Sequence, residues 1–205
     1  MVLWPLLASA AIGYLLGNFQ TGLVVGWASR KIDLRMHGSG GTGATNALRT
    51  LGKGGALLTF LGDFVKGTIA SLLGLAIAGQ EGQLVASLFA VIGHIWPVFF
   101  RFRGGKGVTT SVGSMVIAFP VPVACAAAVS IALMALTRYV SLANIAAEFC
   151  FGIYAIIWGV CSGNALVAII GALIPALVIF AHRTNIRRLL NGKENKLSFK
   201  KAGKA

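Results

Sequence analysis

Long apolar runs alternate with short polar or glycine-rich loops along the whole sequence. A helix that crosses a membrane needs about 20 mostly apolar residues. The pattern predicts seven such helices, at 3–27, 56–78, 84–100, 108–119, 121–136, 142–160 and 165–181. The fourth and fifth are short and are separated only by Pro120 and Pro122, so 108–136 is also compatible with one proline-broken span.

The positions of Lys and Arg separate these two counts. In short loops, these residues accumulate on the cytoplasmic side of a membrane. Every Lys and Arg except Lys66 lies in 28–55, 101–107, 137–141 or 182–205, and the intervening loops contain none. Seven spans place all these segments on one side, with the N-terminus outside and the C-terminus in the cytoplasm. Six spans would put Arg138 and the C-terminal segment on the opposite side from the first basic loops.

Composition also indicates a polytopic membrane protein. The 205 residues are 57% hydrophobic and 11% charged, with a mean hydropathy of +0.83, which excludes a soluble domain with a single core. The net charge of +13 does not indicate nucleic acid. The basic residues would instead line one membrane face, beside anionic headgroups or phosphorylated ligands.

The first basic loop reads H-G-S-G-G-T-G-A-T-N-A-L-R over 37–49. Its glycines match the dinucleotide-binding pattern G-x-G-x-x-G, but that pattern needs a soluble strand before it and a βαβ unit around it. A predicted membrane helix precedes it here, so we reject that interpretation. Small residues, hydroxyls, an amide and a cation instead predict a loop that binds oxyanions. These residues are Ser39, Gly40, Thr42, Gly43, Thr45, Asn46 and Arg49.

The second basic loop lies within G-H-I-W-P-V-F-F-R-F-R-G-G-K-G-V-T-T at 93–110. Its glycines allow backbone N–H groups to converge on an anion, and its cations supply positive charge at the same place. The segment therefore predicts a phosphate site at the end of a membrane helix, or a basic turn that anchors the helix to headgroups. The glycines are Gly104, Gly105 and Gly107, and the cations are Arg101, Arg103 and Lys106.

The third basic segment begins H-R-T-N-I-R-R-L-L-N-G-K-E at 182–194. If it is helical, His182 and Asn185 point to the same neighbour, with Arg183 and Arg187 on another face. A headgroup anchor does not need a histidine and an asparagine in register, which favours a functional segment. We take 1–194 as a single membrane domain and 195–205 as a short, basic, disordered tail.

Charged residues inside predicted spans are costly and rare. Asp63 and Lys66 are three positions apart, so we expect them to pair with each other, or with a buried polar site, and to fix their helix against the inner loops. The sequence identifies no partner for Glu148. The first apolar run contains glycines spaced four apart, which predict close helix packing. These glycines are Gly13, Gly17, Gly22 and Gly26.

The sequence contains no pattern typical of a metal site. His37, His94 and His182 each accompany one basic segment, but no H-x-x-x-H or carboxylate spacing supports them. The three cysteines lie in or beside apolar runs at wide spacing, so we interpret them as buried apolar side chains rather than disulfide or metal ligands.

Together, the three segments resemble the motifs of the PlsY family, the bacterial acyl-phosphate-dependent glycerol-3-phosphate acyltransferases. The matching stretches are S-G-G-T-G-A-T-N at 39–46, G-H, P-V-F and G-G-K-G-V within 93–108, and H-R-T-N-I, R-L and G within 182–192. The stretches at 63–67 and 137–142 are also similar, and the resemblance extends from the first span to Glu194. The first motif of the family is usually S-G-N-x-G-A-T-N, and Gly41 stands where that asparagine is expected.

The resemblance implies an all-α integral membrane enzyme of the bacterial inner membrane, with its active site on the cytoplasmic face. The implied reaction moves a fatty acyl group from acyl phosphate to the 1-hydroxyl of glycerol 3-phosphate, giving lysophosphatidic acid and inorganic phosphate, as the first step of phospholipid synthesis. Its partners would be acyl phosphate, glycerol 3-phosphate and membrane lipids, with no cofactor, metal or nucleic acid. We expect a monomer.

By the same resemblance, the expected catalytic core is Ser39, Arg49, Lys106, His182 and Asn185. Expected binding residues for substrates and phosphates are Gly40, Gly43, Thr45, Asn46, His94, Gly104, Gly105, Gly107 and Arg183. Expected structural residues are Asp63, Lys66 and Glu194. The hydroxyl proton goes either to the donor's own phosphate or to His182 as general base. Functional alternatives to an acyltransferase are a small anion or phosphate transporter and a structural membrane scaffold.

Overall fold

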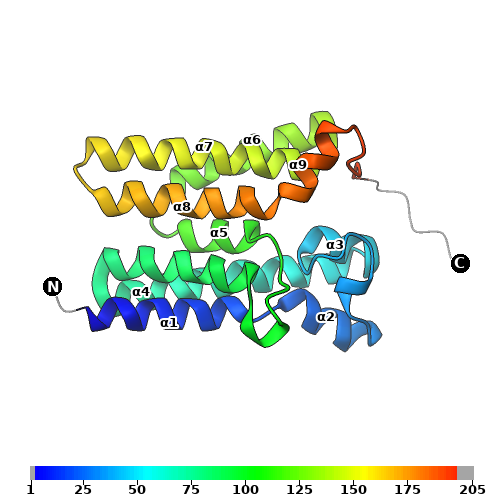
Figure 1. Cartoon of the computed structure of the whole chain (residues 1–205), viewed down its shortest axis with the longest axis horizontal. Coiled ribbons are helices and arrows are strands. Elements are labelled where there is room, and N and C mark those ends of the chain that lie inside the picture. Colours follow the sequence, from blue (N-terminus) through cyan, green and yellow to red (C-terminus); the bar gives the residue numbers. More distant parts are fainter. Residues whose placement is uncertain (1–2, 198–205) are drawn as a thin grey trace, which may run out of the picture.

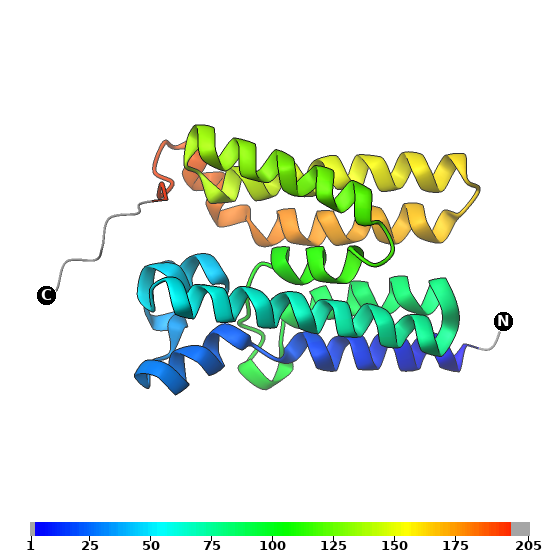
Figure 2. The same ribbon diagram turned by 180° about the vertical axis from the view of Figure 1, so that it is seen from behind.

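The computed structural model describes residues 3–197, and every regular element in that range is a helix. The expected all-α class is therefore confirmed. In Figures 1 and 2 the helices form two layers, with α1 to α4 in one, α6 to α9 in the other, and the short α5 between them. The elements are α1 (Trp4–Asn18), α2 (Thr21–Arg30), η1 (Leu34–Met36), α3 (Ala44–Thr50), α4 (Lys53–Ile95), η2 (Val98–Phe100), α5 (Val108–Met115), α6 (Pro120–Thr137), α7 (Val140–Cys161), α8 (Ala165–Ala181) and α9 (Arg183–Leu190).

Three boundaries differ from those predicted from the sequence. The run 3–27 is broken at Phe19 and Gln20, the run 84–100 stops being α-helical at Ile95, and the run 108–119 is helical only to Met115. The first break has a polar cause. The Lys66 ammonium donates to the Phe19 carbonyl (2.5 Å), and the Gln20 amide donates to the His94 carbonyl (3.2 Å), so side chains satisfy groups near the break. The segment 108–136 is two helices, and Pro120 begins the second, where proline is favoured.

Helix α4 is folded into two antiparallel arms, as both figures show. Ala78 and Gly79 have non-helical backbone angles, and the φ of 59° at Gly79 lies in the left-handed region that favours glycine. Across the hairpin, the Gln83 amide donates to the Ser71 hydroxyl at 3.1 Å. The two arms correspond to the predicted spans 56–78 and 84–100.

Within the described range, three helical stretches are long and apolar enough to cross a membrane: Lys53–Phe100, Pro120–Thr137 and Val140–Cys161. The bent pair α8 and α9, at 59° to each other, would make a fourth if it counts as one span. Helix α5 has eight residues. At about 1.5 Å per residue it cannot by itself cross a hydrocarbon core of about 30 Å. Seven crossings, with the orientation inferred from the basic loops, stay a prediction.

The expected close helix packing is confirmed for the first glycine pair, whereas Gly22 and Gly26 approach the loop residues Thr42 and Ile32 instead of another helix. Gly13 and Gly17 of α1 face Ala86 and Ala90 of the second arm of α4, where any added Cβ would overlap a backbone carbonyl. Gly113 of α5 faces the Phe64 backbone of the first arm in the same way. In lipid, helices associate through such van der Waals contact because the surrounding acyl chains are as apolar as the side chains.

Two further side-chain types in the helices are located by the structure. Glu148 of α7, whose partner could not be identified from the sequence, accepts a hydrogen bond from the Ser111 hydroxyl of α5 at 3.4 Å. Cys125, Cys150 and Cys161 are all exposed, so our interpretation of them as buried side chains is wrong. They lie on outward-facing positions of α6 and α7, where a small apolar side chain is compatible with lipid.

The predicted tail is only partly within the described range. The Leu197 amide donates to the Arg138 carbonyl at 2.8 Å, which joins the start of that segment to the loop before α7. Residues 198–205 lie outside the described residues.

Candidate active site

A cavity of about 310 Å³ receives residues from all three basic segments. It lies where α3, α5 and α7 begin and where α8 ends. All five residues of the expected catalytic core line it: Ser39, Arg49, Lys106, His182 and Asn185. The chain therefore folds so that three loops far apart in sequence share one pocket.

Most of the expected binding residues also line this cavity: Gly43, Thr45, Asn46, His94, Gly105 and Gly107. Gly40, Gly104 and Arg183 do not. The Gly104 amide donates a hydrogen bond to the Ile95 carbonyl (3.2 Å). The Arg183 guanidinium lies over the Phe180 ring, 4.8 Å from its centroid. Both groups therefore have contacts outside the cavity. Gly40 faces a different hollow.

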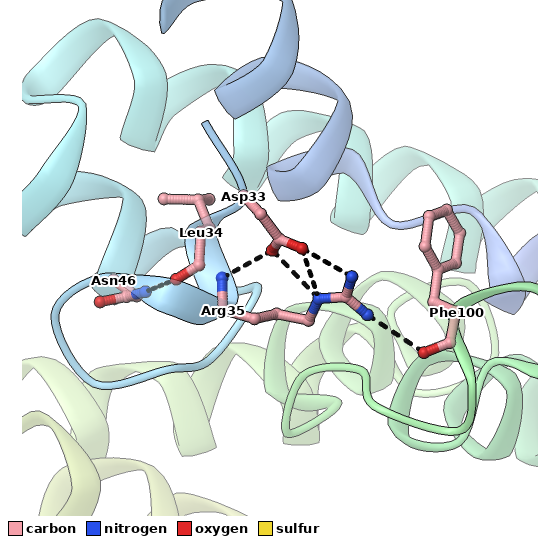
Figure 3. A network of polar contacts seen from close by, with 5 residues as sticks. All are labelled: Asp33, Leu34, Arg35, Asn46 and Phe100. Carbon is pink, nitrogen blue, oxygen red and sulfur yellow. Dashed lines mark hydrogen bonds and ion pairs between the residues drawn. The ribbon is translucent and has the colours of Figure 1, made fainter. Parts of the chain in front are cut away.

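Asn46 fixes the shape of the first basic loop. Its amide nitrogen donates to the carbonyls of Leu34 (3.0 Å), His37 (3.0 Å) and Gly41 (2.8 Å), and its oxygen accepts from the Ser39 amide (2.8 Å). The bond to Leu34 is drawn in Figure 3. The polar atoms of this side chain are thus used on loop backbone, so Asn46 holds Ser39 in place rather than offering a free donor.

The glycine at 41 leaves space beside Ser39. A Cβ built at Gly41 would have only the Ser39 hydroxyl oxygen within 4.0 Å. An asparagine, the residue usual in the family's motif, could therefore be accommodated at this point of the cavity lining. Its amide is the hydrogen-bonding group that this chain lacks.

The first and second segments are joined through His94. The Thr42 hydroxyl donates to the side-chain oxygen Oε1 of Gln20 (2.8 Å). The side-chain amide of Gln20 and the backbone amide of Gly105 both donate to the His94 backbone carbonyl (3.2 and 3.1 Å). A Cβ at Gly105 would collide with the His94 ring, so glycine is required for this close approach. The bonds set the position of the G-G-K-G loop relative to the first loop.

Asp63, Lys66 and His94 form a buried cluster at the wall of the cavity. The Lys66 ammonium lies 2.9 Å from Asp63 Oδ1 and 2.8 Å from His94 Nδ1. The expected Asp63–Lys66 pair is therefore confirmed. Because Lys66 also holds the Phe19 carbonyl, the pair fixes the first arm of α4 to the α1 break and to the residue that anchors the second loop.

Lys106 is the cation of the second segment that reaches the cavity. Burial lowers the pKa of its ammonium to about 8, Glu194 opposes this, and Arg188 and Arg49 add to the lowering. A bound phosphate would offset these costs by supplying negative charge. Lys106, Arg49 and Arg188 repel each other while no anion is bound, and a bound anion would relieve this repulsion. Such an arrangement is expected of an anion site.

Glu194 organises the segment after α9. Its carboxylate accepts from the Asn185 amide (2.7 Å), the Ser141 hydroxyl (2.9 Å) and Arg188 Nε (2.7 Å). Burial would raise the pKa of this carboxyl, but those hydrogen bonds outweigh burial and the pKa lies below its ordinary value. Glu194 also lines the cavity, so its expected structural role stays a prediction.

His182 and Asn185 both face the cavity, as their spacing predicted. His182 lies just past the last residue of α8 and is 1% exposed, and its Nδ1 is 2.8 Å from the Val178 carbonyl. Burial lowers the pKa of this imidazole to about 4, and Lys106 adds to the effect. The neutral ring therefore donates from Nδ1 and leaves Nε2 as an acceptor. The Asn185 side-chain oxygen Oδ1 is buried without a hydrogen-bond partner among the described residues.

Sequence reasoning missed several cavity residues at the start of α7, among them Ser141 and Asn144. Ser141 lies in the stretch 137–142 that resembles the family, which was a signal for it. Asn144 is an isolated polar residue in an apolar run, and its sequence context does not reveal which helix end it faces. With Gly43 and Gly107 before α3 and α5, they bring three helix N-termini to one cavity, and N-termini favour anions. Among residues 3–197, no group of three or more His, Cys, Asp or Glu is placed to hold a metal ion.

Arg101 and Arg103 lie apart from Lys106, contrary to the expectation that all three cations act at one place. They line a second hollow of about 470 Å³ together with Asp33, Arg35, Met36, Gly40, Phe99 and Phe100. Among residues 3–197, the two hollows share no lining residue. The tight turn after η2 directs the two groups of cations to different sites.

A family model described as glycerol-3-phosphate acyltransferase matches residues 7–192. A glycerol-3-phosphate acyltransferase of Desulforudis audaxviator is 44% identical over 190 residues, which cover 93% of this chain and 94% of that protein. Another of that name, from Clostridioides difficile, is 42% identical over 207 residues, covering 98% and 100%.

Two solved structures are also similar. One is described as PlsY, an integral membrane glycerol 3-phosphate acyltransferase, in its glycerol 3-phosphate form, with a TM-score of 0.85, 37% identity, and coverage of 94% of this chain and 96% of that one. The second is the lysophosphatidic acid form, with a TM-score of 0.82, 36% identity, and coverage of 94% and 95%. These likenesses do not favour the transporter alternative.

Proposed function

The chain belongs to the glycerol-3-phosphate acyltransferase family, within its PlsY branch, and from this premise we propose that it transfers a fatty acyl group from acyl phosphate to the 1-hydroxyl of glycerol 3-phosphate. The observation that carries the proposal is the single cavity in which all five expected core residues meet. The products would be lysophosphatidic acid and inorganic phosphate, released at the inner membrane of a bacterium, on its cytoplasmic side.

Binding both substrates requires a site for two phosphates. Arg49 and Lys106 supply fixed or nearly fixed positive charge at the cavity wall. The amide groups in the first turns of α3 and α5 have no intrahelical acceptors and add partial positive charge at the same wall. Holding the two reactants together in the correct orientation is worth about 7 to 11 kcal/mol of the barrier in favourable intramolecular cases.

The lining also suits the apolar part of the donor. Phe60, Met134 and Val140 line the cavity beside the polar motif residues. These residues come from the first arm of α4, from α6 and from α7, so an acyl chain could extend between the two helix layers while its phosphate stays at the motifs. A soluble thioester carrier is not needed to present such a chain.

The proposed chemistry is a direct acyl transfer. The 1-hydroxyl oxygen of glycerol 3-phosphate attacks the carbonyl carbon of the mixed anhydride and forms the new C–O bond. The tetrahedral oxyanion then collapses, the bond from carbon to the phosphate oxygen breaks, and phosphate leaves with the electron pair. The Ser39 hydroxyl and nearby backbone N–H groups are candidate donors to the oxyanion, a role worth about 3 to 4 kcal/mol per donor in other acyl transfers.

The hydroxyl proton has two candidate acceptors, and the electrostatics of the protein favour the donor's phosphate. A general base works best when its pKa lies near the working pH. The pKa of His182 is lowered to about 4 by burial and by Lys106, so its imidazole is a weak base. We assign it instead to positioning, with Nε2 accepting a hydrogen bond from the acceptor substrate while the proton moves to the leaving phosphate.

The reaction is tested with purified protein in lipid nanodiscs, palmitoyl phosphate, and a phosphate-release assay with and without glycerol 3-phosphate. We expect release that depends on the acceptor, and formation of lysophosphatidic acid by mass spectrometry. Palmitoyl coenzyme A in place of palmitoyl phosphate should give no product. Lys106→Met should abolish turnover, and Lys193→Met, at an exposed lysine outside the cavity, should not. Turnover with the thioester but not the acyl phosphate would overturn the assignment of the donor.

A further inference from the structure

The hollow that contains Arg101 and Arg103 is a second site with its own chemistry. Within it, the Asp33 carboxylate forms an ion pair with Arg35, whose guanidinium donates hydrogen bonds to it at 2.6 to 3.1 Å. The two remaining cations, Arg101 and Arg103, form no ion pair among residues 3–197. Because the Asp33 and Arg35 charges cancel, the hollow carries an excess of two positive charges.

Exposed large apolar side chains accompany these cations: Met36 and Phe99 line the hollow with them, and Phe102 lies between the two arginines in the sequence. Met36 is 80% exposed, Phe99 71% and Phe102 58%. In both whole-chain views, the loop between α4 and α5 projects from the side of the helix bundle beside the junction of α1 and α2. Arg101 and Arg103 do not line the active-site cavity. With the basic loops on the cytoplasmic face, as predicted from the sequence, a loop on this flank would lie at the bilayer interface, and its aromatic side chains would meet lipid.

The backbone of this loop is held in an unfavourable conformation. Arg101 and Phe102 have φ values of 57° and 58°, in the left-handed region that residues with side chains rarely adopt. Backbone hydrogen bonds from Phe102 to Pro97 (2.9 Å) and from Arg103 to Phe100 (3.2 Å) keep the turn closed. Such strain is commonly retained where the side chains have a task.

We propose that this hollow binds the headgroup phosphate of an anionic membrane phospholipid, through Arg101 and Arg103, with the acyl chains against Phe99, Phe102 and Met36. Arginine suits this role because its guanidinium forms paired hydrogen bonds with phosphate oxygens. A free phosphate or a soluble anion would leave the exposed aromatic side chains unexplained. The two alternative interpretations of the second basic loop then both apply, to different residues: Lys106 serves the cavity and the two arginines serve the lipid.

The site is tested by lipid titration of the detergent-solubilised full chain, with melting temperature as the readout. Phosphatidylglycerol should raise the melting temperature of the wild type saturably, while phosphatidylcholine and inorganic phosphate should not. In the double variant R101Q/R103Q, the apparent affinity should fall at least about tenfold, because each basic residue near anionic lipid contributes about 1 kcal/mol. The matched control R187Q/K193Q removes two exposed charges from another part of the basic face and should titrate like the wild type.

The outcomes decide between the sources of the anion and do not depend on the proposed acyl transfer. Equal affinity in R101Q/R103Q and the wild type would overturn the site. Stabilisation by inorganic phosphate to the same extent as by the lipid would overturn the lipid assignment. The variant F99S/F102S tests the apolar contacts separately, because it keeps both arginines. It should weaken phosphatidylglycerol binding severalfold. Unchanged affinity would show that these aromatic side chains do not contact the lipid.

Discussion

At the scale of single residues, the cavity works through side chains whose positions are set by others. Asn46 was expected to bind substrate, yet its amide is used to fold the loop that carries Ser39. Lys106 and His182 instead face the cavity, and each has its pKa lowered by burial and by neighbouring positive charge. The pH dependence of the reaction should therefore report on them directly.

The pKa of Lys106 predicts an alkaline limit to catalysis. Since that pKa is lowered to about 8, the side chain is charged below this pH and loses its proton above it. We expect kcat/KM for glycerol 3-phosphate, which reports on the free enzyme, to fall about tenfold per pH unit above the limit. Lys106→Arg should remove the limit, because a guanidinium stays protonated. A wild-type profile that is flat to pH 10, after correction for spontaneous hydrolysis, would contradict the prediction.

A positioning role for His182 predicts a moderate loss on substitution. His182→Gln keeps a polar side chain but cannot reproduce the geometry of Nδ1 and Nε2, so we expect KM for glycerol 3-phosphate to rise about tenfold or more. The fall in kcat should stay below about a hundredfold, since a lost general base can cost up to about ten-thousandfold. A thousandfold fall in kcat with KM unchanged would instead identify His182 as the base. Steady-state kinetics in nanodiscs separate these cases.

At the scale of elements, one side chain ties the first basic loop to the second. Arg35 follows η1's first residue, binds Asp33 through Nε and one terminal nitrogen, and donates from the other to the Phe100 carbonyl at 3.1 Å (Figure 3). The Asp33–Arg35 pair is partly exposed, and such pairs add little stability. Its value is geometric, because it holds the start of the Ser39 loop against η2.

Arg35→Gln should therefore affect catalysis more than stability. The glutamine cannot contact Asp33 and Phe100 together, so the two loops lose this link and keep only the one through His94. We expect kcat/KM to fall about tenfold while the melting temperature changes by only a few degrees. Arg35→Lys should fail similarly, because an ammonium lacks the planar fork. Arg187→Gln, at an exposed residue of α9, serves as the control. Wild-type kcat/KM in both Arg35 variants would show that the loops keep their positions without this tie.

The sequence allowed the prediction of helices and motifs, but not of where the helices end or bend. Apolar length and charge placed the helical segments, and three recognisable motifs identified the five residues that meet in the cavity. The break at Phe19 depends on Lys66, 47 positions away, donating to a backbone carbonyl, and no local pattern contains that contact. The separation of Arg103 from Lys106 likewise depends on a left-handed turn at Arg101 and Phe102. Such a turn is not predicted from the sequence, because residues other than glycine rarely adopt positive φ.

At the scale of the whole molecule, the orientation in the membrane follows from where the basic segments lie. The hairpin tip of α4 and the turn between α7 and α8 contain no Lys or Arg. The cavity, the second hollow and α9 each contain at least one basic residue. Seven crossings put both of the uncharged turns outside. Six crossings, with 108–136 crossing once, keep the first turn outside but move the second turn inside and the end of α9 outside.

Cysteine labelling separates these two arrangements. In a variant without Cys125, Cys150 and Cys161, single cysteines at Glu81, Ser162 and Lys193, all exposed positions, would be treated in whole cells with a maleimide that cannot cross membranes. We expect Glu81→Cys and Ser162→Cys to react in intact cells and Lys193→Cys only after permeabilisation, because positively charged loops are retained in the cytoplasm. The reverse pattern at Ser162 and Lys193, with Glu81 still labelled, would establish six crossings. It would also place the cavity lining from α7 and α8 on the opposite side of the membrane from Ser39 and Arg49, which the shared pocket does not allow.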